Sequence, residues 1–208
     1  MIDVYAWTTP NGFKALIALA EFGLEHEVHW VNIGRGDQIK PEYLAINPNN
    51  KIPAIVDRDG PGGQPITVFE SGAIATHLAE KTGKLLAPSG AARYVALEWT
   101  FFNIGGPGPV LGQLGYFAKF AKEKVPAAIE RFTTEAERLF GVLDRRLGEV
   151  NHLAGDFTIA DIVNFTWPNA ARTFLGMDLS KYANLTRWLD ELTQRPAFAS
   201  ALALKPPA

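Results

Sequence analysis

The chain has 208 residues, of which 47% are hydrophobic, and its formal net charge is -2. This length and composition allow a substantial buried core, whereas the lack of any basic run, and of any apolar run of about 18 residues, argues against a nucleic-acid partner and a membrane span. We therefore expect a cytoplasmic protein that folds into one large domain or two small ones.

The N-terminal part of the chain alternates between predicted strands and predicted helices. The segments are assigned from alternating apolar residues, from helical spacing and from turns rich in glycine and proline. In chain order they are a strand at residues 2–6, a helix at 11–22, a strand at 27–33, strands at 54–57 and 66–69, and a helix at 71–81. The order βαβ followed by ββα predicts a thioredoxin-like α/β domain over residues 1–83.

The C-terminal part loses its strand signals, and from about residue 91 apolar residues recur at helical spacing. The run Gly105-Gly106-Pro107-Gly108-Pro109 should break the first helix, because proline lacks an amide donor and glycine is a poor helix former. Thr158 and Asp161 form a capping-box pattern, which indicates a structural role in starting a later helix. We predict an all-helical domain over residues 91–208 after a linker at 84–90.

Several common catalytic motifs are absent from the sequence. It has no phosphate-binding loop that ends in Lys-Ser/Thr, no dinucleotide fingerprint and no Gly-x-Ser-x-Gly elbow. The histidines are scattered, and His26 and His29 should face opposite sides of one strand, so we expect no metal site. The chain also has no cysteine, which excludes disulfides and a sulfur nucleophile from the protein itself. Any sulfur chemistry must use sulfur that a ligand supplies.

Three segments carry polar groups beside predicted strand ends and helix starts. In Thr8-Thr9-Pro10-Asn11-Gly12, Thr9 and Asn11 can cap the first helix or help to stabilise an anion at its unpaired amides. Asn49-Asn50-Lys51-Ile52-Pro53-Ala54 precedes the third strand, and Phe69-Glu70-Ser71-Gly72-Ala73-Ile74 begins a helix. Together with the helical C-terminal half, these segments resemble the glutathione transferase family over essentially the whole chain.

The resemblance implies a glutathione site on the N-terminal domain. Glu70 would pair with the γ-glutamyl ammonium of glutathione, while Ser71 and the free amides of its helix would bind the adjacent carboxylate. Ile52 would exchange backbone hydrogen bonds with the cysteinyl residue, provided that the Ile52-Pro53 bond is cis, as it is in the family. The cysteinyl sulfur would then lie near Thr9 and Asn11, where donors and the helix dipole favour a thiolate.

Three further residues are expected to contact glutathione. Lys51 and Gln38 are placed to meet its glycyl end, although a solvated lysine and a loop glutamine fit the sequence nearly as well. The combination of Thr-x-Asn, Asn-Pro-Asn-Asn-Lys-Ile-Pro-Ala-Ile and the Gly-Gly-Pro-Gly-Pro run looks like the bacterial Nu class. This class comprises glutathione-dependent disulfide-bond reductases in which an arginine of the helical domain also reaches glutathione. Arg131 matches that position, and a solvated helix charge is an equally good interpretation.

The resemblance implies a glutathione-dependent thiol–disulfide oxidoreductase that forms a homodimer and uses glutathione, reduced or oxidised, with a small disulfide and no metal. One alternative is a transferase that conjugates glutathione to small apolar electrophiles, and another is a non-catalytic ligand-binding or regulatory module. Aromatic residues of the helical domain could line an electrophile pocket, but large apolar residues more often belong to a core. These aromatic residues are Phe101, Phe102, Tyr116, Phe117 and Trp167.

Overall fold

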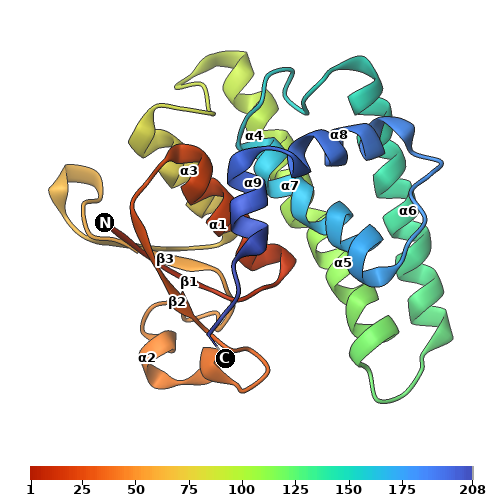
Figure 1. Cartoon of the computed structure of the whole chain (residues 1–208), viewed down its shortest axis with the longest axis horizontal. Coiled ribbons are helices and arrows are strands. Elements are labelled where there is room, and N and C mark those ends of the chain that lie inside the picture. The colour runs from red at the N-terminus through yellow and green to blue at the C-terminus, as the bar shows by residue number, and fades with distance from the viewer. Residues whose placement is uncertain (208) are drawn as a thin grey trace. The chain divides into compact units, whose positions relative to one another are not determined.

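The computed structural model describes residues 1–207, which form two compact units (Figure 1). Unit 1 contains residues 1–88 and the segment that begins at Gln194, and unit 2 contains Ser89–Thr193. The first boundary falls within the predicted linker. The predicted C-terminal domain differs from unit 2, however, because the last helix, α9 (Pro196–Ala203), packs against α1 (Pro10–Phe22) of unit 1. This packing buries the apolar side chains of α9, which explains why the segment leaves the helical unit.

Unit 1 is built on a four-stranded sheet with the order β2-β1-β3-β4. The strands are β1 (Ile2–Ala6), β2 (His26–Trp30), β3 (Ala54–Asp57) and β4 (Ile66–Phe69). β1 runs parallel to β2, while β3 is antiparallel to both β1 and β4. Three strands match their predicted bounds, and only β2 is shorter than the predicted strand at 27–33. The mixed sheet confirms the thioredoxin-like layout.

The helices of unit 1 pack on this sheet and on one another. α1 begins at its N-cap, Thr9, and ends at Gly23, whose φ of 66° suits a residue without a side chain. α1 packs against β1 and against α3 (Ser71–Thr82), and α3 also contacts β3 and β4. The remaining elements of unit 1 are the 3-10 helix η1 (Asp37–Ile39), α2 (Pro41–Leu44) and the 3-10 helix η2 (Pro61–Gly63).

Unit 2 is helical, as predicted. Its elements are α4 (Gly90–Gly105), α5 (Pro107–Gly115), the π-helical turn η3 (Tyr116–Phe120), α6 (Pro126–Glu149), α7 (Ile159–Ala170), the π-helical turn η4 (Ala171–Leu175) and α8 (Ala183–Thr193). The expected break falls between α4 and α5, and the core forms where α4 meets α7 and where α6 meets α5 and α8. No helix within residues 1–207 is long and apolar enough to cross a membrane.

The capping box of α7 is present. The fully buried carboxylate of Asp161 accepts hydrogen bonds from the Thr158 amide at 2.9 Å, the Leu153 amide at 3.0 Å and Trp188 Nε1 at 3.1 Å. These three donors compensate for the loss of hydration of the buried charge. Asp161 therefore has the structural role that the sequence pattern predicted.

Candidate functional site

The site residues predicted in unit 1 flank one end of the sheet. The strand register pairs Tyr5 with Ala54, and Ala54 with Phe69, so β1 and β4 end where β3 begins. The segments attached to these strand ends therefore emerge at the same edge of the sheet. They carry Thr9 and Asn11 after β1, Ile52 and Pro53 before β3, and Glu70 and Ser71 after β4.

The N-terminus of α1 presents polar groups from a tightly packed turn. Thr9 Oγ1 accepts a hydrogen bond from the Gly12 amide at 3.2 Å, which leaves the hydroxyl proton able to serve another acceptor. Asn11 is half-buried and occupies the first helical turn, after Pro10. A Cβ atom on Gly12 would lie 2.0 Å from the carbonyl oxygen of Trp7, so only glycine fits there. Thr9 can thus cap the helix and donate a hydrogen bond to an anion at the same time.

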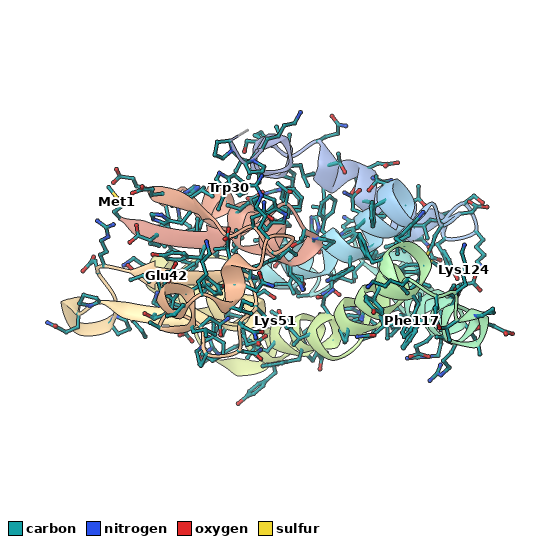
Figure 2. The ribbon with its side chains drawn as sticks, turned by 90° about the horizontal axis from the view of Figure 1, so that it is seen from below. Met1, Trp30, Glu42, Lys51, Phe117 and Lys124 are labelled. Atoms are coloured by element: carbon teal, nitrogen blue, oxygen red, sulfur yellow. The ribbon has the colours of Figure 1, made fainter. Side chains whose placement is uncertain are left out.

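The loop before β3 contains the predicted cis Ile52-Pro53 bond, which the structure confirms. The side chain of Lys51 is exposed (Figure 2), whereas its carbonyl oxygen is bonded inside the unit. That oxygen accepts from the Tyr43 hydroxyl at 2.5 Å and from Asn47 Nδ2 at 2.7 Å. Sequence reasoning missed Tyr43 and Asn47, although the placement of a tyrosine and an asparagine four residues apart, just before this loop, was an available signal.

The N-terminus of α3 contains a backbone outlier. Glu70 has φ of 71° and ψ of 119°, a conformation that side chains disfavour and that costs on the order of 1–3 kcal/mol. Its side chain is exposed, while Ser71, the first residue of α3, is buried. A strained residue persists only when its surroundings hold it in place. Glu70 immediately precedes the first amides of α3, which can bind an anion.

Lys14 is a buried cation that the sequence analysis did not identify. It lies in α1 within the apolar segment that follows Gly12, and it is 2% exposed. Burial lowers the pKa of Lys14 to about 7, and the negative charge of Glu70 partly opposes this effect. The ammonium of Lys14, in the helix that carries Thr9 and Asn11, and the carboxylate of Glu70, just before α3, therefore attract each other. A lysine within an otherwise apolar helical run was the signal for it.

Gln38 lies in η1, after the strand β2. The register pairs Trp30 with Ala6, so β2 also ends at the edge of the sheet where the other candidate residues gather. Gln38 Oε1 is buried and has no hydrogen-bond partner within residues 1–207. An unpaired buried acceptor is costly, and a ligand with an N–H donor would satisfy it.

The candidate residues of unit 2 are more exposed than a core would require. The side chain of Arg131, in α6, is 70% exposed, and its ion pair with Glu135 is long, at 3.9 Å. Phe101 is 65% exposed and Tyr116 is 53% exposed, so the expectation that these aromatic residues belong to a core was wrong for both. The guanidinium of Arg131 and the rings of Phe101 and Tyr116 are therefore accessible on the surface of unit 2.

One group in the described part of the chain has the composition of a metal site. Asp3, Glu27 and His29 bring potential ligand atoms within 4.8 Å of one another. However, Arg58 donates to both Asp3 oxygens, at 2.7 and 2.8 Å, and His29 contacts the same carboxylate at 3.1 Å. The hydrogen bond from Arg58 is the main cause that lowers the pKa of Asp3. A metal ion would have to displace Arg58, so the group is better described as an ion-pair network.

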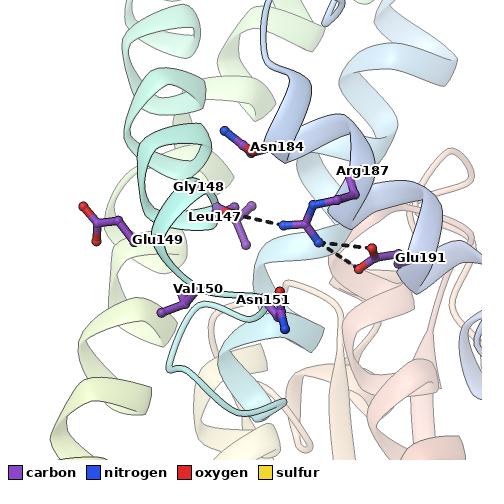
Figure 3. Close-up of a pocket in the computed structure, with 8 residues that line it drawn as sticks. All are labelled: Leu147, Gly148, Glu149, Val150, Asn151, Asn184, Arg187 and Glu191. Atoms are coloured by element: carbon purple, nitrogen blue, oxygen red, sulfur yellow. Dashed lines mark hydrogen bonds and ion pairs between the residues drawn. The ribbon is translucent and has the colours of Figure 1, made fainter.

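A surface pocket of about 350 Å³ lies in unit 2, at the C-terminal end of α6 (Figure 3). The guanidinium of Arg187 points into it, but this group already donates to the Leu147 carbonyl and to both Glu191 oxygens. None of the predicted site residues lines the pocket. Its charges are satisfied internally, and it does not form part of the candidate site.

Comparisons with known proteins give consistent matches over most of the chain. The profile of the glutathione S-transferase N-terminal domain matches residues 8–81, and that of the C-terminal domain matches residues 109–196. The chain is 44% identical to the disulfide-bond oxidoreductase YfcG of Escherichia coli K12 over 204 residues, which cover 97% of this chain and 94% of that protein.

Two solved structures show the same similarity. One is a glutathione transferase family member from Pseudomonas fluorescens Pf-5 with two glutathione molecules bound, at 44% identity and a TM-score of 0.91 over 97% of this chain and 92% of that one. The other is a Pseudomonas putida glutathione transferase with one glutathione disulfide per subunit, at 41% identity and a TM-score of 0.92 over 99% of this chain and 92% of that one.

Proposed function

This chain belongs to the glutathione S-transferase family, and on that basis we propose that it is a glutathione-dependent thiol–disulfide oxidoreductase. The observation that carries the proposal is the convergence of three segments at one end of the sheet in a chain without cysteine. The segments offer donors for a thiolate, a backbone edge and a carboxylate beside a helix N-terminus. These groups match the thiolate, the cysteinyl backbone and the zwitterionic γ-glutamyl end of glutathione, respectively.

Each part of glutathione has a partner in this arrangement. The Glu70 carboxylate receives the γ-glutamyl ammonium, and Ser71 with the first amides of α3 receives the neighbouring carboxylate. The cysteinyl backbone pairs with Ile52. Lys51 and Gln38 bind the glycyl end, where the unpaired Gln38 oxygen can accept the glycyl N–H.

The reaction uses the sulfur atoms of ligands throughout. Thr9 and Asn11 stabilise the glutathione thiolate, which attacks one sulfur of a small disulfide. The disulfide bond breaks, a mixed disulfide with glutathione forms, and the departing thiolate takes up a proton. A second glutathione thiolate then attacks the glutathione sulfur of the mixed disulfide, so that glutathione disulfide and the second substrate thiol are released. Arg131 helps to hold this second glutathione.

The test is the reduction of bis(hydroxyethyl) disulfide by purified protein in the presence of glutathione, measured against an enzyme-free control. Thr9→Val should lower kcat by at least about tenfold, because a hydrogen bond to a charged group contributes about 1.5–3 kcal/mol. The matched control is Thr82→Val, which removes a threonine hydroxyl that bonds the Leu78 carbonyl in the same unit. Absence of turnover by the wild-type protein would refute the proposal.

Conjugation of glutathione to an apolar electrophile is the second candidate function. It is favoured by the exposure of Phe101 and Tyr116, whose rings could contact such a substrate. Chlorodinitrobenzene in place of the disulfide separates the two reactions in the same assay. Tight glutathione binding with neither activity would instead indicate a ligand-binding module.

We propose that the protein acts as a symmetric homodimer in the cytoplasm, as its family resemblance implies. Sedimentation of the purified protein at micromolar concentration tests whether it is a dimer. Fractionation of cells tests whether it is cytoplasmic. A monomer would contradict the proposed assembly without affecting the assignment of the glutathione site.

A further inference from the structure

The Lys51 carbonyl is held by two buried donors, as described above. Tyr43, in α2, is 4% exposed, and Asn47, just beyond it, is 1% exposed. A carbonyl oxygen has two lone pairs, so these two side chains saturate its hydrogen-bonding capacity. Burial raises the pKa of Tyr43 to about 12, which keeps its hydroxyl protonated as a donor at neutral pH.

Asn47 also closes the turn that leads to Lys51. Its Oδ1 accepts from the Asn49 amide at 2.9 Å, and its backbone oxygen accepts from the Asn50 amide at 3.0 Å. Asn50 adopts the left-handed conformation, with φ of 50°, which asparagine tolerates better than most residues. One buried side chain thus fixes both the path of the turn and the carbonyl at its end.

The orientation of this carbonyl determines the orientation of the next amide. The Lys51 C=O and the Ile52 N–H belong to one planar peptide unit and point in opposite directions. The two bonds to the Lys51 oxygen therefore set the direction of the Ile52 N–H. Ile52 donates no hydrogen bond of its own within the described residues 1–207.

We propose that Tyr43 and Asn47 are positioning residues that aim the Ile52 amide at the cysteinyl backbone of glutathione. This inference rests on the proposed function, because it takes Ile52 as the partner of that backbone. Neither side chain needs to touch glutathione. They act by keeping the Lys51-Ile52 peptide in one orientation before the ligand arrives, which reduces the ordering cost of binding.

The test is a calorimetric titration of wild type and variants with reduced glutathione, combined with steady-state kinetics. Tyr43→Phe removes one hydroxyl and leaves the Asn47 bond in place, and it should weaken glutathione binding about fivefold, or about 1 kcal/mol. The KM for glutathione should rise by the same factor, while kcat at saturating glutathione stays nearly constant. Asn47→Ala should weaken binding about tenfold, because it also removes the contact with the Asn49 amide.

The matched control is Tyr182→Phe in unit 2. Tyr182 likewise donates its hydroxyl to a backbone carbonyl, that of Glu137, at 2.9 Å. Tyr182→Phe should lose no more thermal stability than Tyr43→Phe, because its hydrogen bond is exposed, and only Tyr43→Phe should lose glutathione affinity. Wild-type affinity in Tyr43→Phe would overturn the inference, and the mildness of this substitution makes it decisive even if Asn47→Ala does not fold.

The titration also separates this inference from the proposed function. Glutathione binding by the wild type without disulfide reduction would overturn the proposed activity, while weaker binding in Tyr43→Phe would still support the positioning role. Absence of glutathione binding by the wild type would overturn both.

Discussion

Replacing Lys14 with methionine should make the protein more stable at neutral and acidic pH. Methionine retains most of the apolar stem of lysine and removes the charge. Because burial lowers the pKa of Lys14 from its ordinary value of 10.5 to about 7, keeping the ammonium inside the folded protein costs about 5 kcal/mol when the group is fully protonated. This cost is the upper bound of the gain, since the substitution also removes the attraction between Lys14 and Glu70.

The pH dependence gives the sharper test. Below pH 7 both the folded and the unfolded chain carry the proton, and the cost is fully present. Between pH 7 and about 10 the folded protein has lost the proton while the unfolded chain retains it, so wild-type stability rises by up to about 1.4 kcal/mol per pH unit from this group. Lys14→Met lacks this contribution. Its advantage over the wild type should therefore shrink steadily as the pH rises above 7.

The assay is urea unfolding of both proteins, at the same protein concentration and ionic strength, followed by the fluorescence of the tryptophans. Lys124→Met, which changes an exposed lysine, is the matched control and should show a constant difference from the wild type over the same pH range. NMR titration of lysine side chains labelled at Cε, assigned with Lys14→Met, reports the pKa directly. A constant stability difference for Lys14→Met, or titration near the ordinary value, would refute the reasoning.

Three further experiments test the site, and two of them include a control substitution. Asn11→Ala should raise the pKa of the bound glutathione thiol by about one unit and slow turnover about tenfold with nearly unchanged glutathione affinity, and an unaltered pH-rate profile would contradict this. Glu70→Gly should raise the free energy of unfolding by about 1 kcal/mol by relieving strain, and weaken glutathione binding at least tenfold; Glu70→Gln should weaken binding without the gain in stability. Gly12→Ala should cost about 2 kcal/mol or more in unfolding experiments, whereas Gly105→Ala, where the added Cβ meets no atom within 4 Å, should be nearly neutral.

The elements that the sequence predicts well are those whose signals are local. β1, β3 and β4 match their predicted bounds because alternating apolar residues and turn residues mark both ends. The start of α3 at Ser71 and the break between α4 and α5 also have local signals. These are a polar residue at the helix start and a run of glycine and proline, respectively. The glutathione residues of unit 1 other than Gln38 could be proposed for a similar reason, since each lies in a short motif beside a strand end.

Features that depend on contacts between distant segments were not predicted. The C-terminal helix α9 has ordinary helical spacing, and nothing in its own sequence indicates that it packs on α1, more than 170 residues earlier. The hydrogen bonds from Tyr43 and Asn47 to Lys51 are short-range in sequence, but they require knowledge of how the turn closes. Burial of Lys14 is a property of the packed helix, because helical spacing alone does not tell on how many sides α1 is covered.

Three departures from locally favourable structure lie at one end of the sheet in unit 1. Glu70 has an unfavourable backbone conformation, Lys14 is a buried cation, and Gln38 Oε1 is a buried acceptor without a partner within residues 1–207. All three lie on elements that flank the same end of the sheet. Unit 2 also has buried side-chain oxygens without a partner among the described residues, those of Asn164 and Thr166, so an unpaired acceptor by itself does not mark a ligand site. The three costs in unit 1 differ because they lie on elements that flank one end of the sheet, and a sequence selected only for stability would relieve them. A charged, polar ligand bound at that end of the sheet would donate a hydrogen bond to Gln38 Oε1 and pair with the Glu70 carboxylate. Glutathione carries an N–H donor and an ammonium that can make these two interactions.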